Sequence, residues 1–251
     1  MMRKFIVTAT VTALVAMSST CLAGFGLPKV GGTTTAKSPA AATSTESKSS
    51  VDTTDISNKQ AEVLKYMKGA LLAQIKAYQV VDEALGNSDK ELAQAAASLN
   101  SKSGTKEVKA AKSVLDKKAK QLSAEAQKNA DKNKVQVATL AAAIKTGKAY
   151  QQAANINYVV VAAKAPVALK EATSALKSVG SNPMAMNKIN GAINTFKYGA
   201  ELASDSKTVM SEYNKTVDVM KADYGVSDED IKNAKAADAE SIANECLDIV
   251  K

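Results

Sequence analysis

The sequence predicts an all-α protein, an elongated bundle of five to six antiparallel helices behind a disordered N-terminal linker. After Thr54, aliphatic and small residues recur at steps of three and four, the period of a helix with one buried face. Capping residues and glycines divide this pattern into segments of helical length. The longest segment, from Lys134 to Val179, is too rich in small residues to be stable alone, so the other helices are expected to pack along it.

Residues 1–23 have the pattern of a secretory signal peptide. Arg3 and Lys4 precede an apolar run from Phe5 to Met17, which is shorter than the roughly 20 residues that a membrane-spanning helix needs. We expect cleavage after Ala23. The mature protein is therefore expected to be exported, to a bacterial periplasm, to the cell surface or to the extracellular space.

The cleavage separates the two cysteines, Cys21 and Cys246. An alternative makes Cys21 a lipid-modified N-terminus, but Ser18 and Thr20 depart from the aliphatic and small residues that such a site has before its cysteine. Cys246 is left alone, so no intramolecular disulfide can form. We expect it to be a small buried residue, with a disulfide-linked dimer as the alternative.

Residues 24–54 predict a flexible linker. They are rich in Gly, Ser, Thr, Ala, Lys and Pro, with Phe25, Leu27 and Val30 as the sizeable apolar residues at the start. Such a segment cannot bury enough surface to offset the entropy of ordering it. Alternatively, Phe25 and Leu27 dock on the helices or on a partner. The helical domain is expected to span residues 55–251.

Three helices are expected in the first half of this domain. A capping box at Ser57–Gln60 should begin the first, and Gly86–Asn87 should end it. A second capping box, Ser88–Glu91, should begin a short helix that ends near Asn100, and a third helix should run from Thr105 to about 129. The buried positions of the first helix are predicted to be Leu64, Met67, Leu71, Ile75, Tyr78 and Leu85. Those of the third are predicted to be Val108, Ala111, Leu115, Ala119, Leu122 and Ala126.

Proline and glycine mark the boundaries in the second half. Pro166 is expected to kink or divide the long segment, and Gly180 to end it. The pair Asn182–Pro183 should begin a further helix, which Gly225 closes. A last helix should begin at the cap Val226–Ile231. It is expected to pack through Ile242, Cys246 and Ile249.

Two strips of small residues predict a close approach between helices. They consist of Gly69, Ala73 and Ala77 in the first helix, and of Gly191, Thr195, Gly199 and Ala203 in the helix after Pro183. Small side chains at every fourth position allow two backbones to come close together. We therefore expect these two strips to lie against each other.

Charge is unevenly distributed. Residues 102–148 contain twelve lysines and four acids, and residues 201–251 contain twelve acids and six lysines. We predict a basic binding surface centred on Lys109, Lys112, Lys117, Lys118, Lys120 and Lys128, for an envelope protein, an anionic lipid or a polysaccharide. The alternative is that these charges are solvated faces or attract neighbouring helices. Arg3 is the only arginine, so specific recognition of nucleic acid is not expected.

The sequence offers little for catalysis. Histidine is absent, and no nucleophile elbow, phosphate loop or calcium loop is present. We expect no cofactor, no metal and no enzymatic activity, although a pair of carboxylates or a Ser–Lys pair brought together by folding stays open. The predicted role is binding or scaffolding in the bacterial envelope, with self-association as one form of it.

The most apolar stretch, residues 156–169, suggests an alternative role. It is expected to be a central helix buried nearly all round, because its 14 residues include Lys164 and Pro166 and fall short of a membrane span. The competing hypothesis is a membrane-active, pore-forming protein that inserts this segment.

Overall fold

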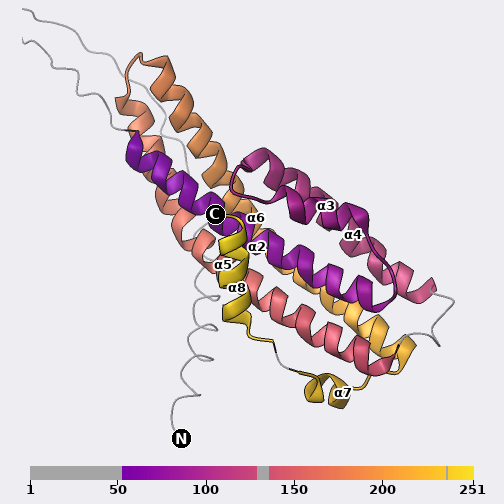
Figure 1. Ribbon diagram of the computed structural model, residues 1–251. Coiled ribbons are helices and arrows are strands. Elements are labelled where there is room, and N and C mark those ends of the chain that lie inside the picture. Colours follow the sequence, from indigo (N-terminus) through magenta and orange to yellow (C-terminus); the bar gives the residue numbers. More distant parts are fainter. Residues whose placement is uncertain (1–52, 129–135, 236) are drawn as a thin grey trace, which may run out of the picture. The chain divides into compact units, whose positions relative to one another are not determined.

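The computed structural model describes residues 53–128, 136–235 and 237–251. Within these ranges the chain is all-α, with seven helices and no strand (Figure 1). The helices are α2 (Thr54–Ala84), α3 (Lys90–Ser98), α4 (Thr105–Lys128), α5 (Val137–Ser178), α6 (Pro183–Tyr224), α7 (Asp228–Asn233) and α8 (Ala239–Ile249). The predicted signal peptide and the predicted linker up to residue 52 lie outside the described residues.

Helix α5 runs antiparallel to α2. Near the start of α2, Lys164 Nζ donates to Glu62 Oε1 at 2.8 Å, and three turns later the hydroxyl of Tyr158 donates to Gln74 Oε1 at 2.9 Å. The residue numbers rise along α2 and fall along α5. The buried faces of these two helices, 31 and 42 residues long, form the largest contact of the fold.

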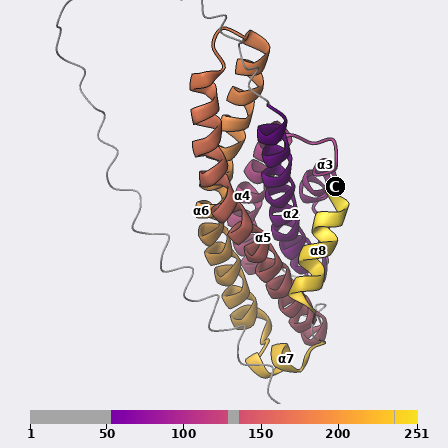
Figure 2. The same cartoon turned by 90° about the vertical axis from the view of Figure 1, so that its left-hand side faces the viewer.

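Helix α6 runs parallel to α2. A Cβ added to Gly199 would lie 3.3 Å from Val63, and the hydroxyl of Tyr78 donates to the carbonyl of Val209 at 3.1 Å. From the first pair to the second, the residue numbers increase along both helices. Figure 2 shows α2, α5 and α6 side by side, with α8 next to α2 and α5. The antiparallel order expected from the sequence therefore applies to α5 against its two neighbours, but not to α2 against α6.

The strips of small residues make different contacts from those expected. A Cβ at Gly199 would lie 3.2 Å from Met67 of α2, but a Cβ at Gly69 would lie 2.7 Å from Leu247 of α8 and 3.3 Å from Asn157 of α5. Gly191 is exposed, and a Cβ added to it would meet no atom within 4 Å. The predicted contact between the two strips is wrong, because Gly69 faces α5 and α8 instead of α6.

Two helices begin at other residues than expected. Helix α2 begins at Thr54, so Ser57 lies inside the helix, where its hydroxyl bonds to the carbonyl of Thr53 at 2.9 Å. The earlier start buries Ile56, which is 7% exposed. The cap of α3 is Asp89 instead of Ser88, and its carboxylate accepts from the amides of the second and third residues that follow.

Helix α5 continues through Pro166 and is not divided there. Pro166 and Ala162 are both exposed, so water can hydrate the Ala162 carbonyl that loses its helical donor. The apolar stretch 156–169 is buried on one side only, since Val167 is 58% exposed and Ile156 is 40% exposed. The expected burial nearly all round is therefore wrong. None of the described helices is long and apolar enough to cross a membrane.

The predicted ends of α6 are confirmed. Asn182 caps its start and Pro183 is its first residue, while Gly225 ends it with a left-handed φ of 69°. A cap within Val226–Ile231 is also confirmed, since Ser227 forms a capping box with Asp230, but the helix that it begins, α7, is only six residues long. The expected last helix is instead divided in two, because Asp238 caps the separate helix α8.

Candidate binding surface

Helix α4 carries the predicted basic surface and packs on α3, α2 and α6. Its buried face is confirmed at the five predicted positions whose side chains are described. These are Val108, Ala111, Leu115, Ala119 and Leu122. The side chain of Ala126, and that of Lys128 in the predicted basic set, lie outside the described residues.

The face of α4 opposite this core carries a line of exposed lysines. Lys106, Lys109, Lys117 and Lys120 are exposed. With Ser113 in the middle, they follow one another at steps of three, four, four and three, which places them along one side of the helix. We call these four lysines the basic stripe. Lys106 is a member that the sequence analysis did not include, although its helical spacing from Lys109 could have identified it.

The other predicted lysines flank the core. Lys112 has a side chain that is 11% exposed and pairs with Asp116 of the same helix at 2.6 Å. Lys118 is 17% exposed and points toward α3. Of the five predicted lysines whose side chains are described, the structure thus exposes Lys109, Lys117 and Lys120 and partly buries Lys112 and Lys118 in ion pairs.

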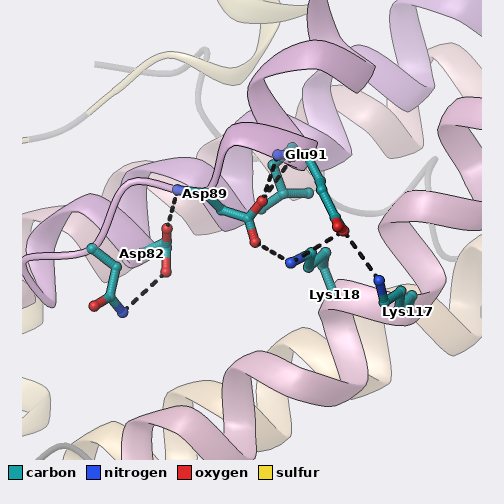
Figure 3. Close-up of polar contacts among 7 residues, drawn as sticks. Asp82, Asp89, Glu91, Lys117 and Lys118 are labelled. Carbon is teal, nitrogen blue, oxygen red and sulfur yellow. Dashed lines mark hydrogen bonds and ion pairs between the residues drawn. The ribbon is translucent and has the colours of Figure 1, made fainter.

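Lys118 connects α4 to the start of α3, as Figure 3 shows. Its Nζ lies 2.6 Å from Asp89 Oδ2 and 3.2 Å from Glu91 Oε2, and Lys117 Nζ also lies 3.2 Å from Glu91 Oε2. The hydrogen bond to Asp89 raises the pKa of Lys118 above its ordinary value. The hydrogen bonds from Lys118 and Lys117 lower the pKa of Glu91. This cluster fastens the α3–α4 hairpin and leaves Lys117 57% exposed.

Asp89 is held from both sides. Its backbone amide donates to Asp82 Oδ2 at 3.0 Å, which ties the start of α3 to the end of α2 (Figure 3). Burial by itself would raise the pKa of Asp89, but the hydrogen bonds from Lys118 and from the amides of Leu92 and Glu91 outweigh it and lower the pKa. Asp89 is therefore a charged structural residue of the hairpin.

Lys109 also contacts the neighbouring helix α6. Its Nζ lies 4.8 Å from the centre of the Tyr198 ring, within the range of a cation–π contact. Burial and the nearby charges of Asp116, Asp205 and Glu201 raise the pKa of Tyr198 to about 12. The acidic residues of α6 are thus near the edge of α4. Even so, the ion pairs of α4 lysines among the described side chains are with Asp89, Glu91 and Asp116, not with residues 201–251.

A small cavity of about 200 Å³ lies between α2 and α5, away from α4. Val63, Val167 and Ala168 form its apolar part. Ion pairs flank it: Glu62 with Lys164 at 2.8 Å, and Lys59 with Glu171. Both carboxylates at this cavity are partly exposed and are paired with lysines.

The described residues contain no cluster of three or more His, Cys, Asp or Glu side chains that could hold a metal ion. Cys246 is fully buried, as expected, and burial raises the pKa of its thiol to about 11. Comparisons with known protein families, curated proteins and solved structures find no match to this chain.

Proposed function

We propose that this chain is an exported, non-enzymatic helical-bundle protein of the bacterial envelope, which binds or scaffolds through the basic stripe of α4. The supporting observation is that Lys106, Lys109, Lys117 and Lys120 are exposed on one face of α4, opposite its buried core. Like charges three and four residues apart destabilise a helix slightly. Lys117 pairs with Glu91 and Lys109 contacts Tyr198, but neither contact by itself requires four lysines along this face.

The chemistry of the stripe favours an extended anionic surface as the ligand. Lysine is a strongly hydrated point charge, which suits attraction to many negative groups better than bidentate recognition of one group. Anionic lipid headgroups and acidic polysaccharides present such surfaces. An acidic envelope protein, or the acidic residues of a second copy of this chain, offers the same type of charge.

The test is co-sedimentation of the mature protein with phosphatidylglycerol vesicles over a range of salt concentrations. A variant with Lys106, Lys109, Lys117 and Lys120 all changed to Gln should bind about two orders of magnitude more weakly, since each lysine near such a surface contributes about 1 kcal/mol and Lys117 is shared with Glu91. The attraction should also weaken as salt is added. Acidic polysaccharide is tested in parallel in the same buffer.

A matched control removes four other exposed lysines. These are Lys170, Lys177, Lys188 and Lys207, on α5 and α6. Their change to Gln alters the net charge equally and should leave binding within a few-fold of wild type. Equal loss in both variants would show that net charge, and not the stripe, drives binding. Dye leakage from the vesicles would instead support the alternative of a membrane-active protein.

A further inference from the structure

A second and larger cavity, of about 380 Å³, opens between α2, the α3–α4 turn and the C-terminal end of α8. Figure 2 shows these segments next to one another. It is lined by Ala61, Glu62, Leu64, Lys65, Lys68, Ser101, Ser103, Val250 and Lys251. The cavity is separate from the basic stripe, so a ligand bound there would be independent of the proposed function.

Lys68 is the unusual residue of this cavity. It is only 4% exposed, and its Nζ donates to the carbonyl of Asn100 at 2.8 Å. An ammonium group has three hydrogen-bond donors, and among the described residues this carbonyl is the acceptor that Lys68 reaches. None of the ion pairs within the described residues includes Lys68. Desolvation by burial lowers the pKa of Lys68 below its ordinary value.

The lining of this cavity carries more positive than negative side chains. Lys65 lies one turn before Lys68 on α2, and its Nζ is 5.8 Å from the centre of the Tyr66 ring. Its charge adds to the hydrogen bond from Lys251 that lowers the pKa of Asp248. The carboxylate of Glu62 at the rim is engaged by Lys164 at 2.8 Å, on the side of α2 that faces α5. Ser101 is an exposed residue of the cavity lining, and its hydroxyl group can act as a hydrogen-bond donor.

A role of Lys68 in stabilising the α3–α4 turn explains only part of why a lysine is buried here. The carbonyl of Asn100 already accepts from the hydroxyl of Ser103 at 2.6 Å, and the amide of Asn100 donates back to that hydroxyl at 3.0 Å. The turn is therefore closed without a lysine. A buried positive charge is costly unless it is paired, and a single neutral carbonyl supplies little of the missing compensation.

We propose that this cavity binds a phosphate group, with Lys68 at its floor, Lys65 at its wall and Ser101 at its mouth. Lysine is a common point-charge ligand for phosphate, and the volume also admits an organic substituent against Leu64 and Val250. Inorganic phosphate and the phosphomonoester headgroup of a lipid share this chemistry. Both would place a negative charge beside Lys68, which takes part in none of the ion pairs among the described residues.

The test uses NMR spectroscopy to follow the backbone amide signals of Ser101 and Ser103 in the mature protein while inorganic phosphate replaces chloride at constant ionic strength. In wild type, the chemical shifts of these amides should change and saturate as phosphate is added. Lys65→Gln should weaken phosphate binding at least tenfold and leave the fold intact, because Lys65 makes no hydrogen bond to the turn among the described residues. Lys68→Met should abolish binding, and Lys90→Gln, at an exposed lysine outside the cavity, should match wild type.

Two results would overturn the proposal. One is the absence of saturable, phosphate-specific shifts in wild type, which would leave Lys68 as a tie for the turn alone. The other is equal phosphate affinity in wild type and Lys65→Gln.

The source of the phosphate is then decided with vesicles of phosphatidic acid and the variant that lacks the basic stripe. Binding that depends on Lys65 identifies a lipid headgroup, and its absence identifies a free phosphate.

Discussion

Gly147 provides the sharpest test of the packing between α2, α5 and α6. A Cβ at this position would lie 2.0 Å from the hydroxyl oxygen of Tyr213 and 3.1 Å from the carbonyl oxygen of Ala77. Tyr213 cannot easily move away, because its ring packs edge-on against Tyr78 with centroids 5.4 Å apart. Its hydroxyl also donates to the carbonyl of Ile144 at 3.3 Å. We therefore expect Gly147→Ala to force the three helices apart locally.

The change in the free energy of unfolding caused by Gly147→Ala is the sum of opposing effects. Overpacking of a core costs about 1–3 kcal/mol, and disturbing the Tyr213 hydrogen bond costs about 1 kcal/mol more. Replacing glycine by alanine inside a helix returns about 1 kcal/mol. Gly147→Ala should thus lower the free energy of unfolding by about 1–3 kcal/mol. Gly191→Ala, the same change at an exposed helical site with no atom nearby, should raise it by up to about 1 kcal/mol.

The assay is urea unfolding followed by circular dichroism, with the midpoint compared at an unchanged slope. The double variant Gly147→Ala/Tyr213→Phe removes the closest clashing atom, so its loss should be smaller than the sum of the two single losses. If Gly147→Ala were as stable as wild type while Gly191→Ala behaved as expected, the described packing of α5 on α2 and α6 would be refuted.

Three further predictions concern single side chains. Asp89→Ala should cost about 1–2 kcal/mol through loss of the helix cap and of the Lys118 contact, measured by urea unfolding. Asp89→Asn should keep the cap. A carboxyl with a lowered pKa stabilises the fold above its unfolded pKa and ceases to do so as pH falls through its folded pKa. Below about pH 4, the free energy of unfolding of Asp89→Asn should therefore decrease less with falling pH than that of wild type. The thiol of Cys246 should react with a disulfide reagent at pH 8 only as the protein unfolds, since it is buried and its pKa is raised to about 11; rapid reaction in native buffer would contradict this. Tyr158→Phe should cost about 1–3 kcal/mol in thermal or urea unfolding, because it leaves the buried oxygen of Gln74 without its donor, and a neutral effect would argue against that hydrogen bond.

The sequence predicts a helix end correctly where the residues that cap the helix lie next to that end in the chain. Asn182 and Gly225 are where capping and left-handed backbone geometry place them, and Ser227 forms its capping box within four residues of chain. In these cases the groups that satisfy the free backbone amides lie in the same short segment. A pattern of residue types is then sufficient.

The sequence predictions of helix ends are wrong where contacts between distant segments of the chain determine where a helix begins or ends. Ser88 and Asp89 are both good caps, and Asp89 is selected because Asp82 holds its amide and Lys118 holds its carboxylate. The end of α7 is fixed by Lys145, whose Nζ donates to the carbonyl of Lys232 at 2.7 Å and also to that of Ala234. No periodicity within residues 226–251 carries this information.

The binding surface shows the same division. The lysine-rich composition of α4 identifies the helix, and its spacing identifies the outer face. Which lysines are exposed depends on the fold, since Lys112 and Lys118 lie at the edges of the core and pair with carboxylates there. The cavity around Lys68 is beyond sequence reasoning, because α2, the α3–α4 turn and α8 come together only in space.

Lysine-selective acetylation, read by mass spectrometry with and without phosphatidylglycerol vesicles, tests most directly whether the stripe on α4 is the binding surface. We predict that bound vesicles slow the modification of Lys106, Lys109, Lys117 and Lys120 several-fold, while Lys170, Lys177, Lys188 and Lys207 react at unchanged rates. Protection confined to the α5 and α6 lysines, or equal protection of both sets, would contradict the assignment of binding to this face.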